Sequence, residues 1–347
     1  MKAKLIKRAG LVVILSHLGT AMVSGQTDKN LINYFREYIG LSDVQIAAVA
    51  NGTGFVKEIP SPNPAEVILF GAVFVKALPE NYLRLLMNVD AQRKLPNFLA
   101  IQPFSAPPQL SDLRGFTLDS EDIEDLRVCV PGSCKVQLPA EEIERFRNSV
   151  DWSAQDAADQ ANGLAQKMAL EALLAYQQGG DSTLGVYRDQ RNPTQVSEEF
   201  QQLVSQLKSL PVYLPELRDY LLGYPKTGLS GMEDQFFWEK ITFGLRPTIR
   251  LVHAMLYQNP GHELAFVYAE KQIYSSHYFH TALELTACAE APDQAGFFLI
   301  TVKASQQSGL TGIKGSVVRP IAVERARTML EGALTGIKKS LEDPSAK

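Results

Sequence analysis

Hydrophobic and polar residues follow two different periods along this chain, and the change between them outlines its elements. Apolar residues recur at helical spacing in "NLINYFREYIG". Ser42 and Gln45 form a capping box that begins a second helix, in "LSDVQIAAVANG". Val, Ile and Phe dominate "GFVKEIP" and "AEVILFGAVFVKA", which predicts two strands. One amphipathic helix is predicted next, in "LPENYLRLLMNVDAQRKL", with Tyr82, Leu85 and Val89 on one side.

The middle of the chain, residues 107–230, has a mixed pattern. An acidic loop is predicted in "LDSEDIEDLR", followed by a hairpin in "LRVCVPGSCKVQLP", where Pro-Gly supplies the turn. Helical spacing returns in "SAQDAADQANGLAQKMALEALLAYQQGG", which ends at Gly179–Gly180, and again in "TQVSEEFQQLVSQL". The prolines of "PVYLPELRDYLLGYPKTGLSG" predict an irregular connector.

From residue 235 the pattern becomes that of β-strands. Five β-prone runs follow one another: "QFFWEKITF", "PTIRLVHAMLY", "ELAFVYAEKQIYS", "HYFHTALELTACA" and "GFFLITVKA". Turn-like breaks lie at Gly244, Asn259–Pro260–Gly261 and Pro292–Asp293. Because the connections between consecutive strands are short, we expect an antiparallel meander.

The chain ends with a long amphipathic helix in "PIAVERARTMLEGALTGIKKSLE". Its apolar stripe keeps helical spacing through Ala322, Ala326, Met329, Leu330, Ala333, Ile337 and Leu341. Pro320 occupies a position that the first turn of a helix tolerates, so we expect the helix to cover residues 320–342.

The order of these elements resembles that of the START-like, or helix-grip, ligand-binding domains. The likeness lies in "VILFGAVFVKALPENYLRLLMNV" (67–89), the β-runs of 235–304 and the helix 320–342. It implies an α+β fold in which a curved antiparallel β-sheet wraps around the long C-terminal helix. It also implies that a hydrophobic or amphipathic small molecule binds between sheet and helix. Some members of the family are enzymes, so the resemblance alone does not define the function.

The predicted organisation follows from this resemblance. The START-like domain comprises residues 63–106 and 231–343, after an N-terminal helical extension of residues 26–62. Residues 107–230 form an insert that contains the cysteine hairpin and the helices. The extension and the insert depart from the family's pattern, and they could cap the cavity or abolish it.

The first 25 residues indicate an exported protein. Four basic residues precede an apolar run from about Leu11 to Val23, and small residues at Val23–Ser24–Gly25 resemble a cleavage site. This layout is typical of a secretory signal peptide cleaved near Gly25, which implies a secreted or periplasmic location. The alternative is an uncleaved anchor, but the run is shorter than the roughly 20 apolar residues that span a bilayer. We therefore expect no stable membrane insertion after cleavage.

Charge and cysteine content refine this picture. The 34 basic and 38 acidic residues, less the four basic ones near the start, leave a mature net charge of about −8. This acidic balance disfavours nucleic acid and anionic membrane surfaces as partners. In an oxidising compartment we expect a disulfide between Cys129 and Cys134, with free thiols as the alternative. A metal site is disfavoured because Cys288, which lies in an apolar run, is the only other thiol.

Alternation along the strands places three ionisable side chains on apolar faces: Glu239, His253 and His277. They could bond a polar neighbour within the core, line a ligand cavity, or form a two-histidine, one-carboxylate metal site. His280 lies three residues after His277, so a strand separates the two rings and a helix would place them together. We favour the strand, and the helix remains an alternative.

Three further residues are candidate ligand contacts: Lys271, Trp238 and Tyr274. We expect Arg250 to face solvent. The chain has no zinc-protease motif, phosphate-binding loop, calcium loop or nucleophile elbow, so we predict no cofactor and identify no catalytic residue. The first hypothesis is an exported protein that binds a hydrophobic or amphipathic, lipid-like small molecule, and we favour this binding role over an enzymatic one without excluding the latter. The alternatives are an enzyme that uses Glu239, His253 and His277, and a protein–protein interaction module without a ligand.

Overall fold

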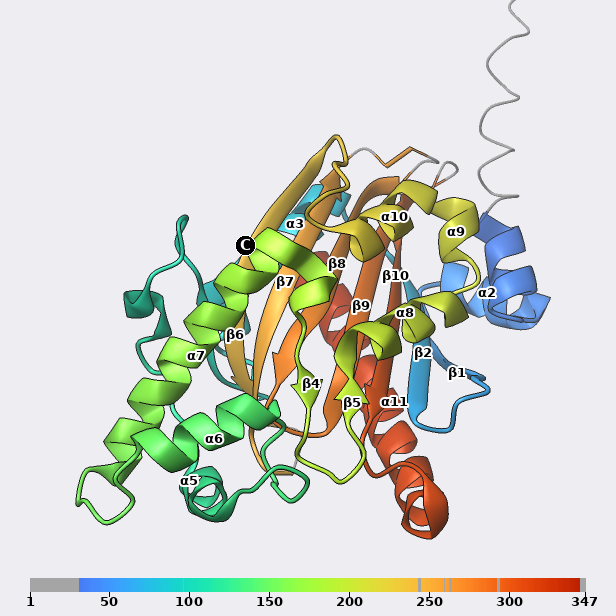
Figure 1. The fold of residues 1–347 in the computed structure, drawn as a ribbon. Coiled ribbons are helices and arrows are strands. Elements are labelled where there is room, and N and C mark those ends of the chain that lie inside the picture. Colours follow the sequence, from blue (N-terminus) through green and yellow to red (C-terminus); the bar gives the residue numbers. More distant parts are fainter. Residues whose placement is uncertain are drawn as a thin grey trace, which may run out of the picture.

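The computed structural model describes residues 31–343, apart from residues 96, 243–244, 259, 262–263 and 292–293 and the side chain of residue 314. The predicted signal peptide, residues 1–25, and the breaks predicted at Gly244 and Pro292–Asp293 lie outside the described residues. The fold is α+β, with one large antiparallel sheet and helices on both of its faces (Figure 1). Among the described residues, no helix combines the length and the apolar character that a membrane crossing requires.

The large sheet has eight strands in the order β1-β2-β10-β9-β8-β7-β6-β3. Their bounds are β1 Phe55–Ile59, β2 Glu66–Val75, β3 Phe98–Pro103, β6 Met232–Ile241, β7 Thr248–Gln258, β8 Leu264–Ser275, β9 Phe279–Glu290 and β10 Phe297–Gln307. The five β-runs predicted from residue 235 are therefore confirmed as the meander β6–β10. β3 was not predicted because its short run shows no clear alternation, and it pairs with β6 across the insert.

The long C-terminal helix α11 (Gly312–Glu342) packs against β1, β2 and the short helix α3 (Pro79–Leu86). Leu330 and Leu334 lie directly over Gly71 of β2, where an added Cβ would stand 3.0 Å from both leucine side chains. Glycine at this position therefore allows the helix to approach the sheet closely. The described structure confirms a large antiparallel sheet with a long C-terminal helix.

Two details of the predicted α11 are wrong. The helix begins at Gly312, because the interior Pro320 removes one hydrogen bond without ending the helix. The buried stripe runs through Val323, Leu330 and Leu334, whereas Met329 and Ala333 are exposed.

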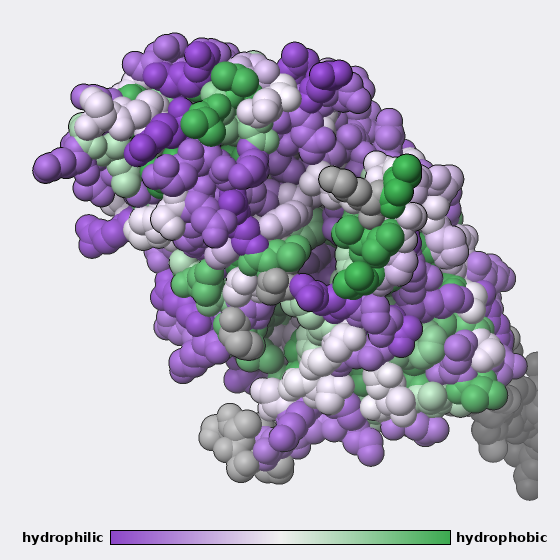
Figure 2. Space-filling model, turned by 90° about the horizontal axis from the view of Figure 1, so that it is seen from below, coloured by the Kyte–Doolittle hydropathy of each residue, from purple (hydrophilic) through white to green (hydrophobic). Residues whose placement is uncertain are grey.

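The first half of α11 also presents apolar residues to solvent. Ile313, Val317 and Ile321 are spaced four residues apart, so they share one face of the helix, and all three are exposed. Hydrophobic side chains gather at this end of the molecule beside a hollow (Figure 2).

The insert packs on the face of the sheet opposite α11 (Figure 1). Its helices are η2 Leu110–Leu113, α5 Ser120–Val128, α6 Ala140–Ser149, α7 Ala157–Gly179, η3 Gly180–Thr183, α8 Val196–Gln206, α9 Leu210–Tyr213 and α10 Pro215–Gly223, and its strands are β4 Val186–Tyr187 and β5 Thr194–Gln195. The N-terminal helices η1 (Tyr34–Tyr38) and α2 (Asp43–Ala50) pack on this same face, against Phe70 and Ile300. The capping box of α2 is confirmed.

Three local predictions require correction. The predicted acidic loop is the helix α5, because Ile123 and Leu126 are buried while its acidic residues favour the helix N-terminus. The single helix predicted after β2 is divided into α3 and α4 (Val89–Gln92), since Asn88 is extended and caps α4 with its side chain. The predicted irregular connector contains α9 and α10, whose prolines occupy first-turn positions.

The disulfide between Cys129 and Cys134 is present, with a Cα–Cα distance of 4.6 Å. The predicted hairpin around it is only a single bridge between Val130 and Ser133, because the preceding residues belong to α5. Cys288 is buried, as expected.

Candidate functional site

The six candidate residues from the sequence do not gather in one site. Phe236 pairs with His253 and Glu239 pairs with Arg250, so odd positions of β6 share a face with even positions of β7. Glu239 therefore faces the α11 side, and His253 faces the insert. Both faces of the sheet are covered, and therefore both are apolar. Alternation within a single strand cannot show which positions of β6 and β7 point to the same side of the sheet, because that depends on the register between them.

Five of the six candidates belong to the insert side of the sheet. His253 and Lys271 pair directly across β7 and β8, and both bond residues of the insert. Trp238 donates from Nε1 to the carbonyl oxygen of Asp112 at 2.9 Å, and Tyr274 packs in the core between sheet and insert. His277 lies in the connection between β8 and β9 rather than in a strand.

His253 is fully buried, and it bonds one residue of the insert and one residue of the neighbouring strand β6. Its Nε2 lies 2.7 Å from Asp234 Oδ1, and its Nδ1 lies 3.1 Å from the hydroxyl of Tyr176 on α7. Burial lowers the pKa of His253, while the Asp234 carboxylate opposes that change. The ring also stacks on Phe236 of β6.

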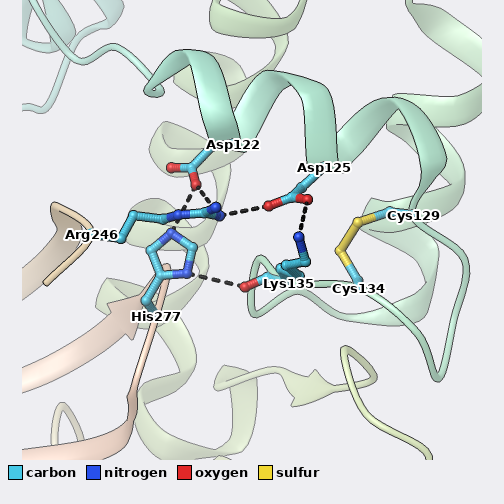
Figure 3. Close-up of a disulfide and its surroundings, with 7 residues drawn as sticks. All are labelled: Asp122, Asp125, Cys129, Cys134, Lys135, Arg246 and His277. Carbon is cyan, nitrogen blue, oxygen red and sulfur yellow. Dashed lines mark hydrogen bonds and ion pairs between the residues drawn. A yellow bond between two sulfur atoms is a disulfide. The ribbon is translucent and has the colours of Figure 1, made fainter.

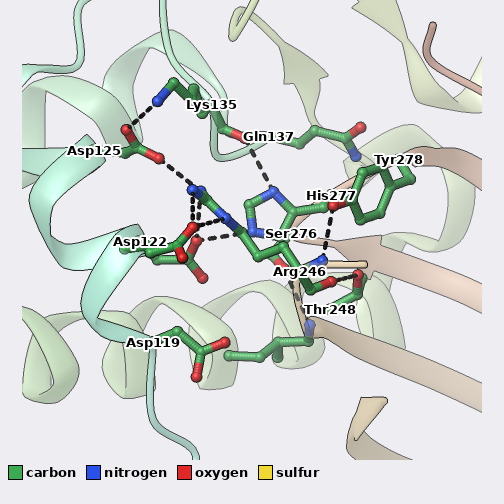
Figure 4. A network of polar contacts seen from close by, with 12 residues as sticks. Asp119, Asp122, Asp125, Lys135, Gln137, Arg246, Thr248, Ser276, His277 and Tyr278 are labelled. Carbon is green, nitrogen blue, oxygen red and sulfur yellow. Dashed lines mark hydrogen bonds and ion pairs between the residues drawn. The ribbon is translucent and has the colours of Figure 1, made fainter. Parts of the chain in front are cut away.

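His277 belongs to a polar network beside the disulfide (Figure 3). Its Nδ1 lies 3.0 Å from the carbonyl oxygen of Lys135 and its Nε2 lies 3.0 Å from Asp122 Oδ1. Arg246 binds Asp122 at 3.1 Å and Asp125 at 2.6 Å, which ties α5 to the sheet (Figure 4). Since both ring nitrogens face oxygen acceptors, the network holds His277 in place.

The two histidines do not form a pair. His280 lies at an irregularity of β9 and bonds Glu199 of α8 at 2.9 Å, whereas His277 bonds α5 and the loop after it. The metal hypothesis built on Glu239, His253 and His277 is wrong, because Glu239 lies on the other face of the sheet. Within the described ranges, no group of three or more His, Cys, Asp or Glu side chains is placed to hold a metal.

A different set of polar residues occupies the α11 side of the sheet. Each strand of the meander contributes one charged side chain, and together they form the inner charged cluster: Glu239, Arg250, Glu270, Glu284 and Lys303. Glu284 stands directly opposite both Glu270 and Lys303 in its two neighbouring strands. Directly opposite residues in antiparallel strands lie about 5 Å apart, so these side chains can interact.

The cluster contains two ion pairs and one carboxyl group outside them. Arg250 Nε lies 2.7 Å from Glu239 Oε1, and Lys303 Nζ lies 2.5 Å from Glu284 Oε2. Arg250 is thus buried in an ion pair and does not face solvent, which corrects the prediction from the sequence. In the part of the chain that the structure describes, no ion pair joins Glu270 to a cation.

Part of this cluster is open to water. The side chains of Lys303 and Glu284 remain 40% and 30% exposed, although β9 and β10 lie inside the sheet and are paired on both sides. The insert and the N-terminal helices cover the other face, so this exposed surface must open on the α11 side. Seen from below, the molecule has a hollow that both hydrophobic and hydrophilic side chains border (Figure 2).

The three carboxyl groups differ in pKa because their partners differ. Burial is the largest cause that raises the pKa of Glu270 to about 8, and repulsion from Glu284 and Glu239 adds to it. Burial also raises the pKa of Glu239, although Arg250 offsets part of this effect. For Glu284, burial is outweighed by attraction to Lys303 and Arg250, so its pKa is lowered. A carboxyl group with a pKa near neutral can bind a cation or exchange a proton at physiological pH.

Gln272 adds an unsatisfied acceptor to the same face. It stands opposite Val252, whose side chain packs in the core under α11, and it lies two residues after Glu270. Its Nε2 donates to the carbonyl oxygen of Phe279 at 3.1 Å, but its buried Oε1 has no hydrogen-bond partner among the described residues. Such buried acceptors are uncommon in native structures.

A separate surface groove of about 560 Å³ lies outside this cluster, along α3, α4 and β3. Its Arg93 binds Asp90 at 2.9 Å and Gln102 at 2.7 Å, so its main polar groups already bond one another. We therefore place the candidate site at the inner charged cluster.

The candidate residues predicted from the sequence do not include Glu270, Gln272, Glu284 or Lys303. The sequence contains a signal for Glu270 and Gln272, because every second residue of β8 lies on the same face. On one face these residues change from the aromatic Phe266 and Tyr268 to the polar Glu270 and Gln272. The chain matches no protein-family model and no curated protein.

Glu270→Gln is expected to be more stable than the wild type, by an amount that increases as pH rises from 5 to 8. Its pKa of about 8 exceeds the ordinary value of 4.5, so the native state binds the proton more tightly than the unfolded state between these values. The contribution of Glu270 to stability therefore falls from pH 4.5 to pH 8. In urea unfolding, the free energy of unfolding of Glu270→Gln should exceed that of the wild type by on the order of 4 kcal/mol at pH 8, and by less than about 1 kcal/mol at pH 5.

The matched control is Glu284→Gln, which removes a carboxylate that Lys303 stabilises. This variant should be less stable than the wild type at pH 8. An equal gain for Glu270→Gln at both pH values would contradict the environment assigned to Glu270.

Proposed function

We propose that this protein binds a hydrophobic or amphipathic small molecule between the sheet and α11. The observation that carries the proposal is the exposure of Glu284 and Lys303 in the middle of an eight-stranded sheet, on the face that α11 partly covers. Charged side chains in such a place need water or a polar ligand group. Binding sites of this kind are mostly apolar and contain a few polar groups that orient the ligand.

Apolar side chains next to the cluster support an amphipathic ligand. Leu69, Val73, Phe266 and Leu299 pack on the same side of the sheet as the charged residues. On α11, the partly buried residues that pack against this core include Ala322 and Ala326, whose side chains are small. A ligand with a polar head and an apolar tail would match both parts of this lining.

The connectivity supports our proposal that the chain is START-like. From β2 the chain continues through two short helices, β3, the meander β6–β10 and α11, and β2 lies beside β10. We regard β1, the N-terminal helices and the insert as additions to a helix-grip domain. Because the helical additions pack on the face opposite α11, they leave the proposed binding space open.

The proposed location is outside the cytoplasm, after removal of the first 25 residues. The disulfide between Cys129 and Cys134 supports this location, since such bonds persist mainly in oxidising compartments.

Calorimetric titration with three ten-carbon amphiphiles tests the proposed function. Decylamine, decanoate and 1-decanol are each added to the purified protein below the concentration at which they aggregate, and at least one should bind with a ratio of one per chain. Ala326→Trp should lower that affinity at least tenfold, because the indole would occupy space between helix and sheet.

Ala333→Trp is the control, because Ala333 is an exposed alanine of the same helix. It should bind like the wild type. If none of the three amphiphiles binds, or if both tryptophan variants bind as the wild type does, the proposal is wrong.

A further inference from the structure

With every group ionised, the inner charged cluster has one negative charge in excess. Its three carboxyl groups meet only two cations, and each cation is already engaged, Arg250 by Glu239 and Lys303 by Glu284. Glu270 stands directly opposite Glu284, so two acidic side chains are adjacent. The cation next to them, Lys303, stands opposite Glu284 on its other side, in β10. Like charges directly opposite in a sheet are destabilising, and such an arrangement persists most readily where function requires it.

The unsatisfied Oε1 of Gln272 is an independent observation on the same face. Gln272 is 2% exposed, and the alternation of β8 projects its side chain on the same side as that of Glu270. The missing partner is a hydrogen-bond donor, because an amide oxygen can only accept. The Oε1 of Gln272 therefore lacks a donor among the described residues. Glu270 is hydrogen-bonded by Tyr268 but has no cation of its own, because Arg250 and Lys303 are engaged by other carboxylates.

We propose that the ligand carries a protonated amine, and that this group binds Glu270, Glu284 and the Oε1 of Gln272. The inference rests on the proposed binding function and defines the chemistry of the ligand's head. An ammonium group has three N–H donors and one positive charge, which match three acceptors and the unpaired carboxylate. Glu284 can keep its bond to Lys303, since a carboxylate accepts several hydrogen bonds.

Other head groups fit this site less well. A carboxylate head would meet three acidic side chains, while the two basic ones are already paired. A hydroxyl head could donate to Gln272 but would not compensate the charge of an ionised Glu270. The apolar side chains around the cluster would hold the tail of the amine, so a long-chain alkylamine is the simplest probe.

Binding of an amine should be linked to a proton on Glu270. The groups that face Glu270 are Glu239, Arg250, Glu284 and Lys303 from the other strands, Tyr268 from its own strand and Tyr82 from α3. Below its pKa of about 8, Glu270 must lose a proton before it pairs with the ammonium group. Affinity for the amine should therefore rise as pH rises toward 8.

The test compares decylamine, 1-decanol and decanoate in calorimetric titrations of the wild type at pH 6 and pH 8. Decylamine should bind at least tenfold more tightly than 1-decanol at pH 8, and decanoate should bind most weakly. Its affinity should increase at least tenfold from pH 6 to pH 8. Glu270→Gln should lower the affinity for decylamine at least tenfold and remove this pH dependence.

Glu144→Gln is the control, because Glu144 is a surface residue of α6 paired with Arg147, far from the cluster in the chain. It should leave decylamine binding unchanged. Since Glu270→Gln is expected to stabilise the fold, unfolding would not explain a loss of binding. If 1-decanol or decanoate binds as tightly as decylamine, the amine inference is wrong although the binding function stands. If none of the three binds, the proposed function itself fails.

Discussion

Leu330→Asp is expected to lower the free energy of unfolding by at least about 4 kcal/mol. Leu330 is 3% exposed at the middle of α11, where it packs over Gly71 with Leu334. The substitution removes a buried leucine, which alone costs about 2–5 kcal/mol, and it places a carboxylate against an apolar surface. Because α11 covers β1 and β2 through this contact, the variant should unfold at a much lower urea concentration or fail to fold.

Met329→Asp provides the matched control, since Met329 precedes Leu330 in the same helix and is 45% exposed. The same new charge at this position should change the stability by less than about 1 kcal/mol. Equal urea midpoints for the two variants would show that α11 does not pack on the sheet through Leu330.

Lys271→Met should lower the free energy of unfolding by about 3–5 kcal/mol, because it breaks a buried ion pair. Lys271 is fully buried and binds Asp181 of η3 and the carbonyl oxygen of Leu221 on α10, at 3.0 Å for the carbonyl. Its Nζ also lies 3.9 Å from the ring centroid of Phe200 on α8. Without the ammonium group, the buried carboxylate of Asp181 would have no counter-charge.

The double variant Lys271→Met/Asp181→Leu separates the ion pair from general packing. Replacing both partners should restore most of the lost stability, since no buried charge then remains. Lys226→Met, at an exposed position of the insert, should be nearly neutral. If Lys271→Met unfolds at the same urea concentration as the wild type, the ion pair does not hold the insert on the sheet.

The polar side chains of the meander show how far sequence patterns reach. Adjacent residues such as Glu270 and Lys271 lie on opposite faces of one strand, and this can be read from the sequence because side-chain direction depends only on the local backbone. Alternation could not show that Glu239 faces away from His253. The register between β6 and β7 decides that relation, and both faces of each strand are apolar.

The helical regions show a similar division. Helical spacing identified α7, α8 and the second half of α11, where the apolar stripe is long. The acidic residues of α5 and the proline of α10 predicted a loop and an irregular connector instead of helices. Both helices are short, and their few apolar side chains are buried within the insert. Packing, rather than local preference, stabilises helices of that length.

The strands of the meander, the disulfide and the long amphipathic helix follow from the sequence by itself, because each depends on residues that are close together in the chain. The tertiary structure alone decided which face of the sheet the insert covers and which charged residues meet on the other. Residues from five strands, between Glu239 and Lys303, come together only through strand pairing. The register of that pairing depends on contacts throughout the sheet. The sequence of a single strand therefore cannot show which charged residues meet at the site.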